Sequence, residues 1–399
     1  MVPTILSCIS VFRDIRDGWE EHLRGIDMKK YYRVYIVFTF GMIAVLGLFS
    51  VLLPEKGYSE NENRYLKQFP KVTVKNVLSG DYQKKFEESF SDQFLGRDIW
   101  MKASTTVKRA AGFQEVSGVY LGKSGYYITK TTQEDIDQKQ YLRNLRYVEY
   151  LGKTCGGTAS TILVPSPGTI LKDKIPNHAP FYDADAMYHE AETVLKMAKN
   201  IDVRSELKEY AKQNQVYYCT DHHWTLLGAY AAYSAYSDTN QMLKHTYGYF
   251  AVKKITEDFL GTAYSKVMPV NAKKDMMYAA TNVPQATVLY DGVERNSIYD
   301  VEKLTQKDKY AYFFGGNYGE AVITMNEKPK KKLLVVKDSY ANCFVPFLME
   351  SFDQITMIDL RYYKKSVQKL LQENNYEQVL VLYEMSNFAQ DTNLYKLAY

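Results

Sequence analysis

The chain lacks the cysteine patterns that hold small secreted folds together or bind structural zinc. Its four cysteines lie far apart in 399 residues, without a Cys-x-x-Cys pair. A disulfide scaffold and a zinc ribbon both need closely spaced cysteines, so the sequence predicts neither. Cys8 lies in an Ile-Leu-Ser-Cys run, but no hydrophobic segment of signal-peptide length precedes it, so we expect no lipidation there.

A strong charge of one sign is also missing. The chain has 50 Lys and Arg against 46 Asp and Glu, a net charge of +4, which gives no basis for a nucleic-acid partner. Charged residues make up 24% and apolar residues 46%, which excludes a disordered or collagen-like chain. The length exceeds that of a usual single domain, so we expect one large domain with an accessory region.

Long hydrophobic runs are absent except for one, at residues 34–53. This stretch, VYIVFTFGMIAVLGLFSVLL, has no charge and no polar helical face, which predicts a helix that crosses a membrane. Two lysines and an arginine lie within the five residues before it, so the positive-inside rule places residues 1–33 in the cytoplasm and the chain after Pro54 outside. No small-residue cleavage pattern follows, so we expect a retained single-pass anchor. The outer part has no Asn-x-Ser/Thr sequon, which favours a bacterial cell envelope.

After the apolar run, the sequence pattern divides the chain into two parts. Residues 54–115 are polar and rich in helix formers, which indicates a membrane-proximal helical arm. In residues 116–399, short apolar strands alternate with helices, which predicts an α/β domain with a parallel sheet covered on both faces. Chemistry in such sheets gathers at the carboxyl ends of strands. The predicted strands include 216–219, and in the C-terminal part, where the pattern is clearest, the strands 333–336, 355–360 and 378–383 alternate with helices at 341–352 and 366–374.

Two short segments that each follow a predicted strand carry an acid, an imidazole and a hydroxyl. TDHHWT at 220–225 supplies Asp221 and His223, and KDSY at 337–340 supplies Ser339. A serine hydroxyl needs a base to take its proton. The two-residue spacing lets Asp221 hold one ring nitrogen of His223 while the other nitrogen faces the serine. The Gly-x-Ser-x-Gly elbow is absent, which excludes the α/β-hydrolase nucleophile motif.

Three alternative interpretations of these residues stay open. An Asp-Ser pair before a helix is commonly only a cap. Asp221 and His222 could serve a metal hydrolase, although neighbouring side chains rarely converge on one ion without a third ligand nearby, and we expect no metal. The chain could also be a non-catalytic polysaccharide-binding or assembly subunit of an envelope complex, in which some of its 36 tyrosines stack on sugar rings.

The combination of motifs resembles the DHHW protein family over about residues 55–399. The family is similar to SGNH hydrolases, especially the alginate O-acetylation proteins. The resemblance implies an SGNH-like α/β fold with a flavodoxin-like parallel sheet and a circularly permuted order of motifs. The segments that carry it are TDHHWT followed by GAYAAY, SENENRYLKQFP, FFGGNYGE, KKLLVVKDSYANCFVPFL, MIDLRYY and VLVLYEMSNF.

The resemblance also implies roles for single residues. Ser339 would be the nucleophile, His223 the general base and Asp221 its orienting acid. Lys337 stands where the SGNH serine block usually has a glycine, and the glycines expected beside the other blocks are missing. The oxyanion or substrate-binding candidates are Asn387, Arg361, Asn317, Tyr340, His222 and Trp224, of which Trp224 could instead anchor its loop and His222 could pack away from the site.

The activity that the resemblance implies is O-acetyl transfer. The chain would be a membrane-anchored O-acetyltransferase or acetylesterase that acts on a cell-surface polysaccharide or exopolysaccharide through an acetyl-serine intermediate. A multi-spanning membrane O-acyltransferase would be its partner and would deliver the acetyl groups. This chemistry would require neither a metal nor an organic cofactor.

Overall fold

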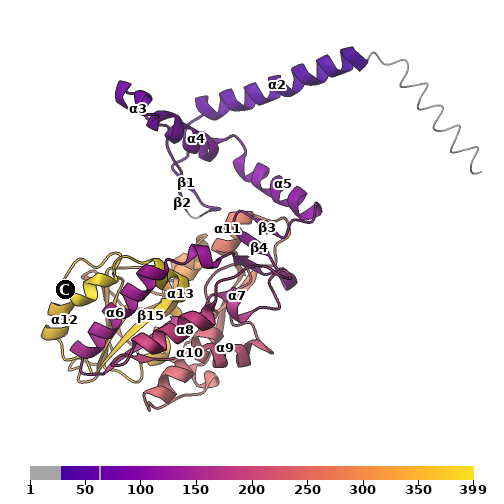
Figure 1. Ribbon diagram of the computed structural model, residues 1–399. Helices are drawn as coiled ribbons and strands as arrows, with labels where there is room; N and C mark the ends of the chain where they lie inside the picture. The colour runs from indigo at the N-terminus through magenta and orange to yellow at the C-terminus, as the bar shows by residue number, and fades with distance from the viewer. Residues whose placement is uncertain (1–27, 63) are drawn as a thin grey trace, which may run out of the picture. The chain divides into compact units, whose positions relative to one another are not determined.

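The computed structural model of the chain describes residues 28–62 and 64–399 (Figure 1). Cys8 and most of the predicted cytoplasmic segment 1–33 therefore lie outside the described residues. The described chain forms two compact units. The first comprises 28–59 and 64–99, and the second comprises 60–62 and 100–399.

The first unit is mainly helical and contains the apolar run. Helix α2, Met28–Leu52, is long and apolar enough to cross a membrane, and an 18-residue window in it has a mean hydropathy of 2.3. It begins six residues before the predicted span and ends one residue earlier. Along helix α4, Asp81–Gln93, and its C-cap Phe94, the aromatic rings spaced four apart contact one another in succession, with ring centroids 5.6–6.0 Å apart. The other elements here are β1 Tyr58–Ser59, β2 Arg64–Tyr65, α3 Val74–Leu78 and α4 Asp81–Gln93.

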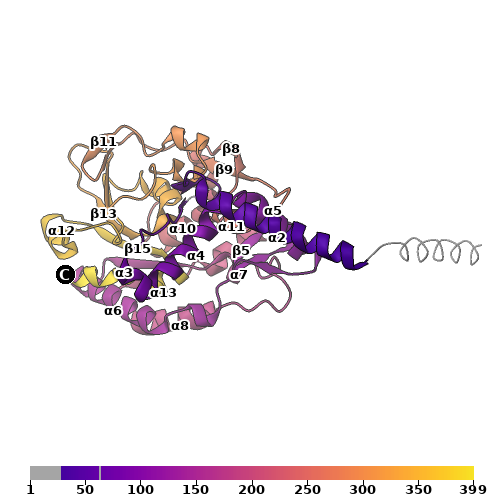
Figure 2. The same cartoon turned by 90° about the horizontal axis from the view of Figure 1, so that it is seen from above.

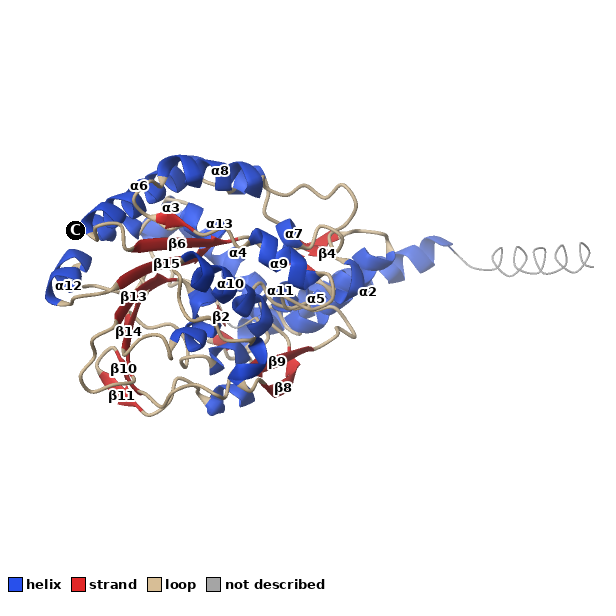
Figure 3. Cartoon of the chain, turned by 90° about the horizontal axis from the view of Figure 1, so that it is seen from below, coloured by secondary structure: helices blue, strands red, loops and turns tan. Residues whose placement is uncertain are grey.

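An eight-stranded sheet forms the centre of the second unit (Figure 3). The strand order is β11-β10-β12-β14-β13-β15-β6-β7, and the five strands from β14 to β7 are parallel. The predicted parallel sheet is therefore confirmed for this half. The parallel strands are β14 Gln354–Ile358, β13 Lys332–Lys337, β15 Gln378–Glu384, β6 Ala159–Val164 and β7 Lys199–Asn200.

The other edge of the sheet is antiparallel, which differs from the prediction. Strands β10, Thr287–Tyr290, and β11, Val293–Arg295, are joined by Asp291-Gly292, and both of these linking residues have positive φ, 46° and 88°. Such a two-residue turn closes a β-hairpin, so the direction of these strands is set locally. Strand β12, Glu320–Thr324, pairs antiparallel with both β10 and β14.

Helices cover both faces of the sheet because its strands are apolar on both sides. In β13, Leu333 and Val335 belong to one buried cluster, and Leu334 and Val336 belong to the other. Helix α10 packs in the first cluster and α6 and α8 pack in the second, and the C-terminal segment lies beside α6 (Figures 1 and 2). The helices of this unit are α5 Arg97–Ala110, which begins in the first unit, α6 Gln138–Thr154, α7 Pro167–Ile170, α8 Ala184–Val194, α9 Arg204–Ala211, α10 Leu226–Thr239, α11 Thr262–Val267, α12 Val367–Glu373 and α13 Met385–Gln390.

Two predicted elements near the chemistry-bearing motifs take another form. Residues 341–352 make two 3₁₀ helices, Ser339–Cys343 and Val345–Leu348, because Pro346 has no N–H to continue an α-helix. Residues 216–219 make only an isolated bridge to Trp224 instead of a strand of the sheet. Two small antiparallel sheets complete the fold: β3 Glu115–Val116, β4 Val119–Leu121 and β5 Tyr127–Thr129, and β8 Lys253–Phe259 with β9 Asp275–Ala279.

Candidate active site

The turn that presents Ser339 follows β13 and is fixed by its neighbour Asp338. Asp338 is buried, and its Oδ1 accepts the backbone N–H of Tyr340 at 3.0 Å. Its Oδ2 accepts the backbone N–H of Glu384 at 2.9 Å, which ties the turn to the end of β15. Asp338 is therefore the helix cap that the sequence allowed, and the hydroxyl of Ser339 is left for other contacts.

Asp275 of β9 fixes the start of the loop at 220–225 through hydrogen bonds. Oδ1 of Asp275 accepts the backbone N–H of Cys219 at 2.9 Å and Nε2 of Gln215 at 2.6 Å. Oδ2 accepts the backbone N–H and the hydroxyl of Thr220 at 2.8 and 2.6 Å. Burial raises the pKa of Asp275, and these hydrogen bonds oppose the rise. The sequence analysis missed Asp275, because no motif or spacing links it to the loop.

Asp221 approaches the backbone of the segment between β8 and α11 closely. A Cβ atom at Gly261 would lie 2.3 Å from the Asp221 carboxylate, so only glycine fits there. The next residue, Thr262, donates its backbone N–H and its hydroxyl to Asp221 Oδ2 at 2.7 and 3.0 Å. One oxygen of the carboxylate is thereby fixed, and the other is directed at His223.

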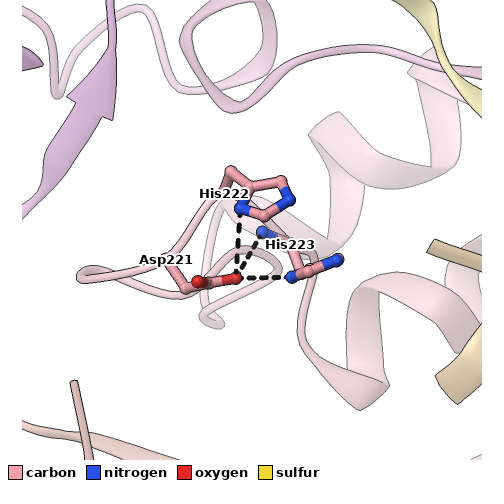
Figure 4. A group of neighbouring side chains, drawn as sticks. All are labelled: Asp221, His222 and His223. Atoms are coloured by element: carbon pink, nitrogen blue, oxygen red, sulfur yellow. Dashed lines mark hydrogen bonds and ion pairs between the residues drawn. The ribbon is translucent and has the colours of Figure 1, made fainter. Parts of the chain in front are cut away.

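The structure brings Ser339, His223 and Asp221 into one hydrogen-bonded chain, although 116 residues separate the first two. Oγ of Ser339 is 2.7 Å from Nε2 of His223, and Nδ1 of His223 is 2.6 Å from Oδ1 of Asp221. Oδ1 also accepts the backbone N–H of His223 at 2.9 Å. Figure 4 shows these contacts of Asp221 with the two neighbouring histidines. Asp221 and His223 are 3% and 6% exposed, while Ser339 is half-buried.

The charge of Asp221 determines which nitrogen of His223 carries the hydrogen. Burial alone would raise the pKa of Asp221, but the imidazoles of His222 and His223 and the hydrogen bonds outweigh it and hold this pKa well below its usual range. An ionised carboxylate accepts only, so Nδ1 of His223 donates to it and the lone pair of Nε2 faces Ser339. The ring of Tyr310 stacks on His223 with centroids 3.8 Å apart and fixes its plane.

Three of the other predicted residues join the two loops. Nε1 of buried Trp224 donates to the carbonyl of Tyr340 at 3.0 Å, so Trp224 anchors the loop. The buried hydroxyl of Tyr340 donates to the carbonyl of His222. His222 remains 34% exposed, with Nδ1 2.7 Å from the hydroxyl of Thr262. Burial and the adjacent His223 lower the pKa of His222, which favours a neutral ring at the rim of the site.

The three oxyanion candidates differ in what their side chains contact. Asn387 donates its amide N–H to Asp338 at 3.0 Å, and Arg361 binds Asp359 with two nitrogens at 2.9 and 2.6 Å. Asn317 presents its oxygen to Nζ of Lys337 at 2.9 Å. Among the described residues, none of the three hydrogen-bonds to Ser339 or His223.

The same loop places three metal-ligand atoms close together. Donor atoms of Asp221, His222 and His223 all lie within 4.8 Å of one another. Two ligands about 2.0–2.2 Å from a tetrahedral zinc ion would be about 3.3 Å apart. Oδ1 of Asp221 and Nδ1 of His223 are only 2.6 Å apart, so this pair has the spacing of a hydrogen bond. The arrangement fits proton transfer better than coordination.

Comparison with protein families agrees with the motifs. Residues 187–358 match the family described as DHHW protein. The DHHW resemblance is confirmed. The matched residues include both the TDHHWT segment at 220–225 and Ser339. No curated protein matches the chain.

Solved structures with a similar fold include a DHHW family protein and PatB1. The DHHW family protein from Eubacterium siraeum has a TM-score of 0.60 at 20% identity, with 71% of this chain and 96% of that chain covered. Bacillus cereus PatB1 with a sulfonyl adduct has a TM-score of 0.57 at 23% identity, with coverages of 70% and 97%. A second PatB1 structure gives 0.54 at 23%, with coverages of 67% and 96%. The likeness confirms the predicted SGNH-like α/β fold.

Proposed function

We propose that this chain is a membrane-anchored, extracytoplasmic serine enzyme that transfers or removes O-acetyl groups on a cell-surface polysaccharide or exopolysaccharide. The single observation that carries the proposal is the hydrogen-bonded chain from Ser339 through His223 to Asp221. A serine, a base and a buried acid in this order are the parts of an activated nucleophile. The half-buried position of Ser339 leaves room for an acyl group to reach it.

The proposed reaction has two acyl-transfer steps. In the first, Oγ of Ser339 attacks the carbonyl carbon of an acetyl ester while its proton passes to Nε2 of His223. The donor's C–O bond then breaks, and His223 returns the proton to the departing alcohol, which leaves an acetyl group on Ser339. In the second, a sugar hydroxyl attacks this ester with His223 as base, and Ser339 is restored. Water in place of the sugar makes the same enzyme an esterase.

Two groups support the charges that arise in these steps. The buried carboxylate of Asp221 stabilises the imidazolium formed on His223. The negative oxygen of the tetrahedral intermediate needs a fixed donor, and such donors give large rate effects. Asn317 is the proposed donor, because its amide nitrogen has no hydrogen-bond partner among the described residues, whereas Asn387 and Arg361 each direct N–H groups to a carboxylate.

Helix α2 supports the proposed location. Its length and composition suit a membrane span, and the basic residues before the apolar run favour an extracytoplasmic second unit. The acetyl donor would come from a membrane-bound O-acyltransferase partner that carries the acetyl group across the membrane. The proposed steps use no metal and no organic cofactor.

The direct test is hydrolysis of an activated acetyl ester, 4-nitrophenyl acetate, by the full chain in detergent. We expect the natural chain to release acetate and the Ser339→Ala variant to lose this activity. Ser205→Ala is the matched control, because Ser205 is exposed and, among the described residues, its hydroxyl hydrogen-bonds only to neighbouring Glu206. Equal rates in the natural chain and Ser339→Ala would eliminate the serine mechanism and favour a non-catalytic subunit. Inhibition by a chelator, with one bound metal per chain, would favour a metal hydrolase.

A further inference from the structure

A buried lysine with an unusual set of partners lies two residues before Ser339. Lys337 is 3% exposed, and its Nζ donates to Oδ1 of Asn317 at 2.9 Å and to Oδ1 of Asn342 at 2.8 Å. Within residues 28–62 and 64–399, no carboxylate lies within ion-pair distance of this ammonium group. A buried charge held by two amide oxygens is costly, so its place beside the nucleophile needs an explanation.

The lysine determines how both amides are oriented. An ammonium group has donors only, so each asparagine must turn its oxygen toward it. Nδ2 of Asn342 then donates to Oδ1 of Asn317 at 3.3 Å. With two donors on its oxygen, Asn317 directs Nδ2 out of the cluster, and this nitrogen has no hydrogen-bond partner among the described residues.

In the cluster of Lys337, Asn317 and Asn342, the last residue lies one helical turn from the nucleophile. Asn342 follows Ser339 by three residues in the 3₁₀ helix Ser339–Cys343, and side chains three apart in such a helix lie above one another. The loop that delivers Asn317 is strained at Phe314, a bulky residue with a positive φ of 64°, while Gly315 and Gly316 after it adopt positive φ freely. Such strain in a bulky residue typically persists at functional sites.

We propose that Lys337 is a positioning residue of the acyl-transfer site, which fixes the Asn317 amide with Nδ2 outward to donate to the oxyanion formed at Ser339. The inference rests on the proposed function and adds to it a residue outside the triad.

The electrostatic surroundings of Lys337 keep it charged at neutral pH. Burial lowers the pKa of Lys337 to about 8, and Arg361 adds to this effect, while Asp359 and Asp338 oppose it. A charged donor on its oxygen polarises the Asn317 amide and strengthens the outward N–H as a donor.

The test is a double-mutant cycle of Lys337→Met and Asn317→Ala in the full chain, with 4-nitrophenyl acetate as substrate. Loss of an oxyanion donor predicts that Asn317→Ala lowers kcat by about 10²–10³ with little change in KM. Lys337→Met lowers kcat by at least about tenfold, because the freed Asn317 amide turns its nitrogen to the Asn342 oxygen. In the Asn317→Ala background, Lys337→Met has less than about a twofold further effect on kcat.

Lys396→Met is the matched control, because Nζ of half-buried Lys396 also donates to two oxygens, the carbonyls of Leu360 and Tyr363. This variant should lower Tm but keep the natural kcat. Independent, multiplying effects of Lys337→Met and Asn317→Ala would overturn the inference, and so would a natural kcat in Lys337→Met. Natural activity in Ser339→Ala would overturn the proposed function as well. If Ser339→Ala is inactive but the cycle fails, only the role of Lys337 is overturned and the proposed function stands.

Discussion

Asp221, which binds His223, and Glu384, whose backbone N–H binds Asp338, are both buried carboxylates, yet their surroundings shift their pKa values in opposite directions. Two imidazoles and the donors of Thr262 hold the pKa of Asp221 down despite its burial. Glu384 accepts hydrogen bonds from the hydroxyls of Ser166 and Ser386, but burial prevails and raises its pKa. Their different neighbours suit Asp221 to catalysis and Glu384 to support of the turn that presents Ser339.

Replacement of Asp221 by Asn tests the orienting role. The amide cannot act as a charged acceptor for Nδ1, so His223 loses both its fixed tautomer and the stabilisation of its imidazolium form. We expect kcat for acetyl-ester hydrolysis to fall by about 10³–10⁴ with KM nearly unchanged. Steady-state rates of the purified full chain give both constants. A kcat within twofold of the natural value would show that Asp221 has only a structural role.

Replacement of Glu384 by Gln tests the shifted pKa through stability. Because its pKa is raised, the folded chain binds this proton more tightly than the unfolded chain, so Glu384 contributes stability at acid pH that is lost as pH rises through the folded pKa. Gln does not titrate, keeps one oxygen for Ser386 and can donate to the hydroxyl of Ser166. We therefore expect the Tm of Glu384→Gln relative to the natural chain to rise as the pH increases above the ordinary glutamate pKa of 4.5, with about 1.4 kcal/mol for each tenfold difference in proton affinity. A difference in Tm that does not change with pH would contradict the raised pKa.

At the scale of elements, the hairpin of β8 and β9 acts as a support for the loop at 220–225. Its strand β9 contributes Asp275, which accepts four hydrogen bonds from residues 215–220. The segment that leaves β8 contributes Gly261 and Thr262, which contact Asp221. The positions of His223 and Asp221 thus depend on residues that take no part in the proposed reaction.

Replacement of Asp275 by Asn should disturb this support. The amide offers one acceptor oxygen in place of two, so at least one buried donor of the loop loses its partner, at a cost of about 1–3 kcal/mol. We expect kcat to fall at least tenfold because His223 shifts relative to Ser339, and Tm to fall as well. Asp353→Asn is the control, since Asp353 also accepts two successive backbone N–H groups, those of Lys330 and Lys331. A natural kcat in folded Asp275→Asn would limit Asp275 to a role in stability.

The sequence predicts elements well where local pattern and packing agree. Strands β13 and β15 lie within one residue of their predicted bounds, because their apolar runs fill both clusters of the core. The helix predicted at 341–352 was wrong, although Pro346 marks the break. Asp291-Gly292 is a clear signal for a hairpin turn, but the alternation of strands and helices along the sequence favoured a parallel sheet. Asp275 and the partners of Lys337 depend on tertiary contacts, which no spacing in the sequence reveals.

At the scale of the whole molecule, the parallel sheet explains how two distant motifs meet. Adjacent parallel strands end at the same edge, so the turn after β13 lies beside the end of β15, where Asp338 connects them. The loop at 220–225 reaches this edge from another part of the chain through buried Trp224, which binds the backbone of Tyr340. Motif order along the chain therefore matters less than position at the edge of the sheet.

The most direct measurement of the central claim is covalent labelling of the full chain with phenylmethanesulfonyl fluoride, followed by mass spectrometry of its peptides. An activated serine attacks the sulfonyl group, so the account predicts one adduct, on Ser339, that forms at least about 10³-fold more slowly in His223→Ala. Labelling of Ser339 at the same rate in His223→Ala, or an unlabelled Ser339 in the natural chain, would contradict the account.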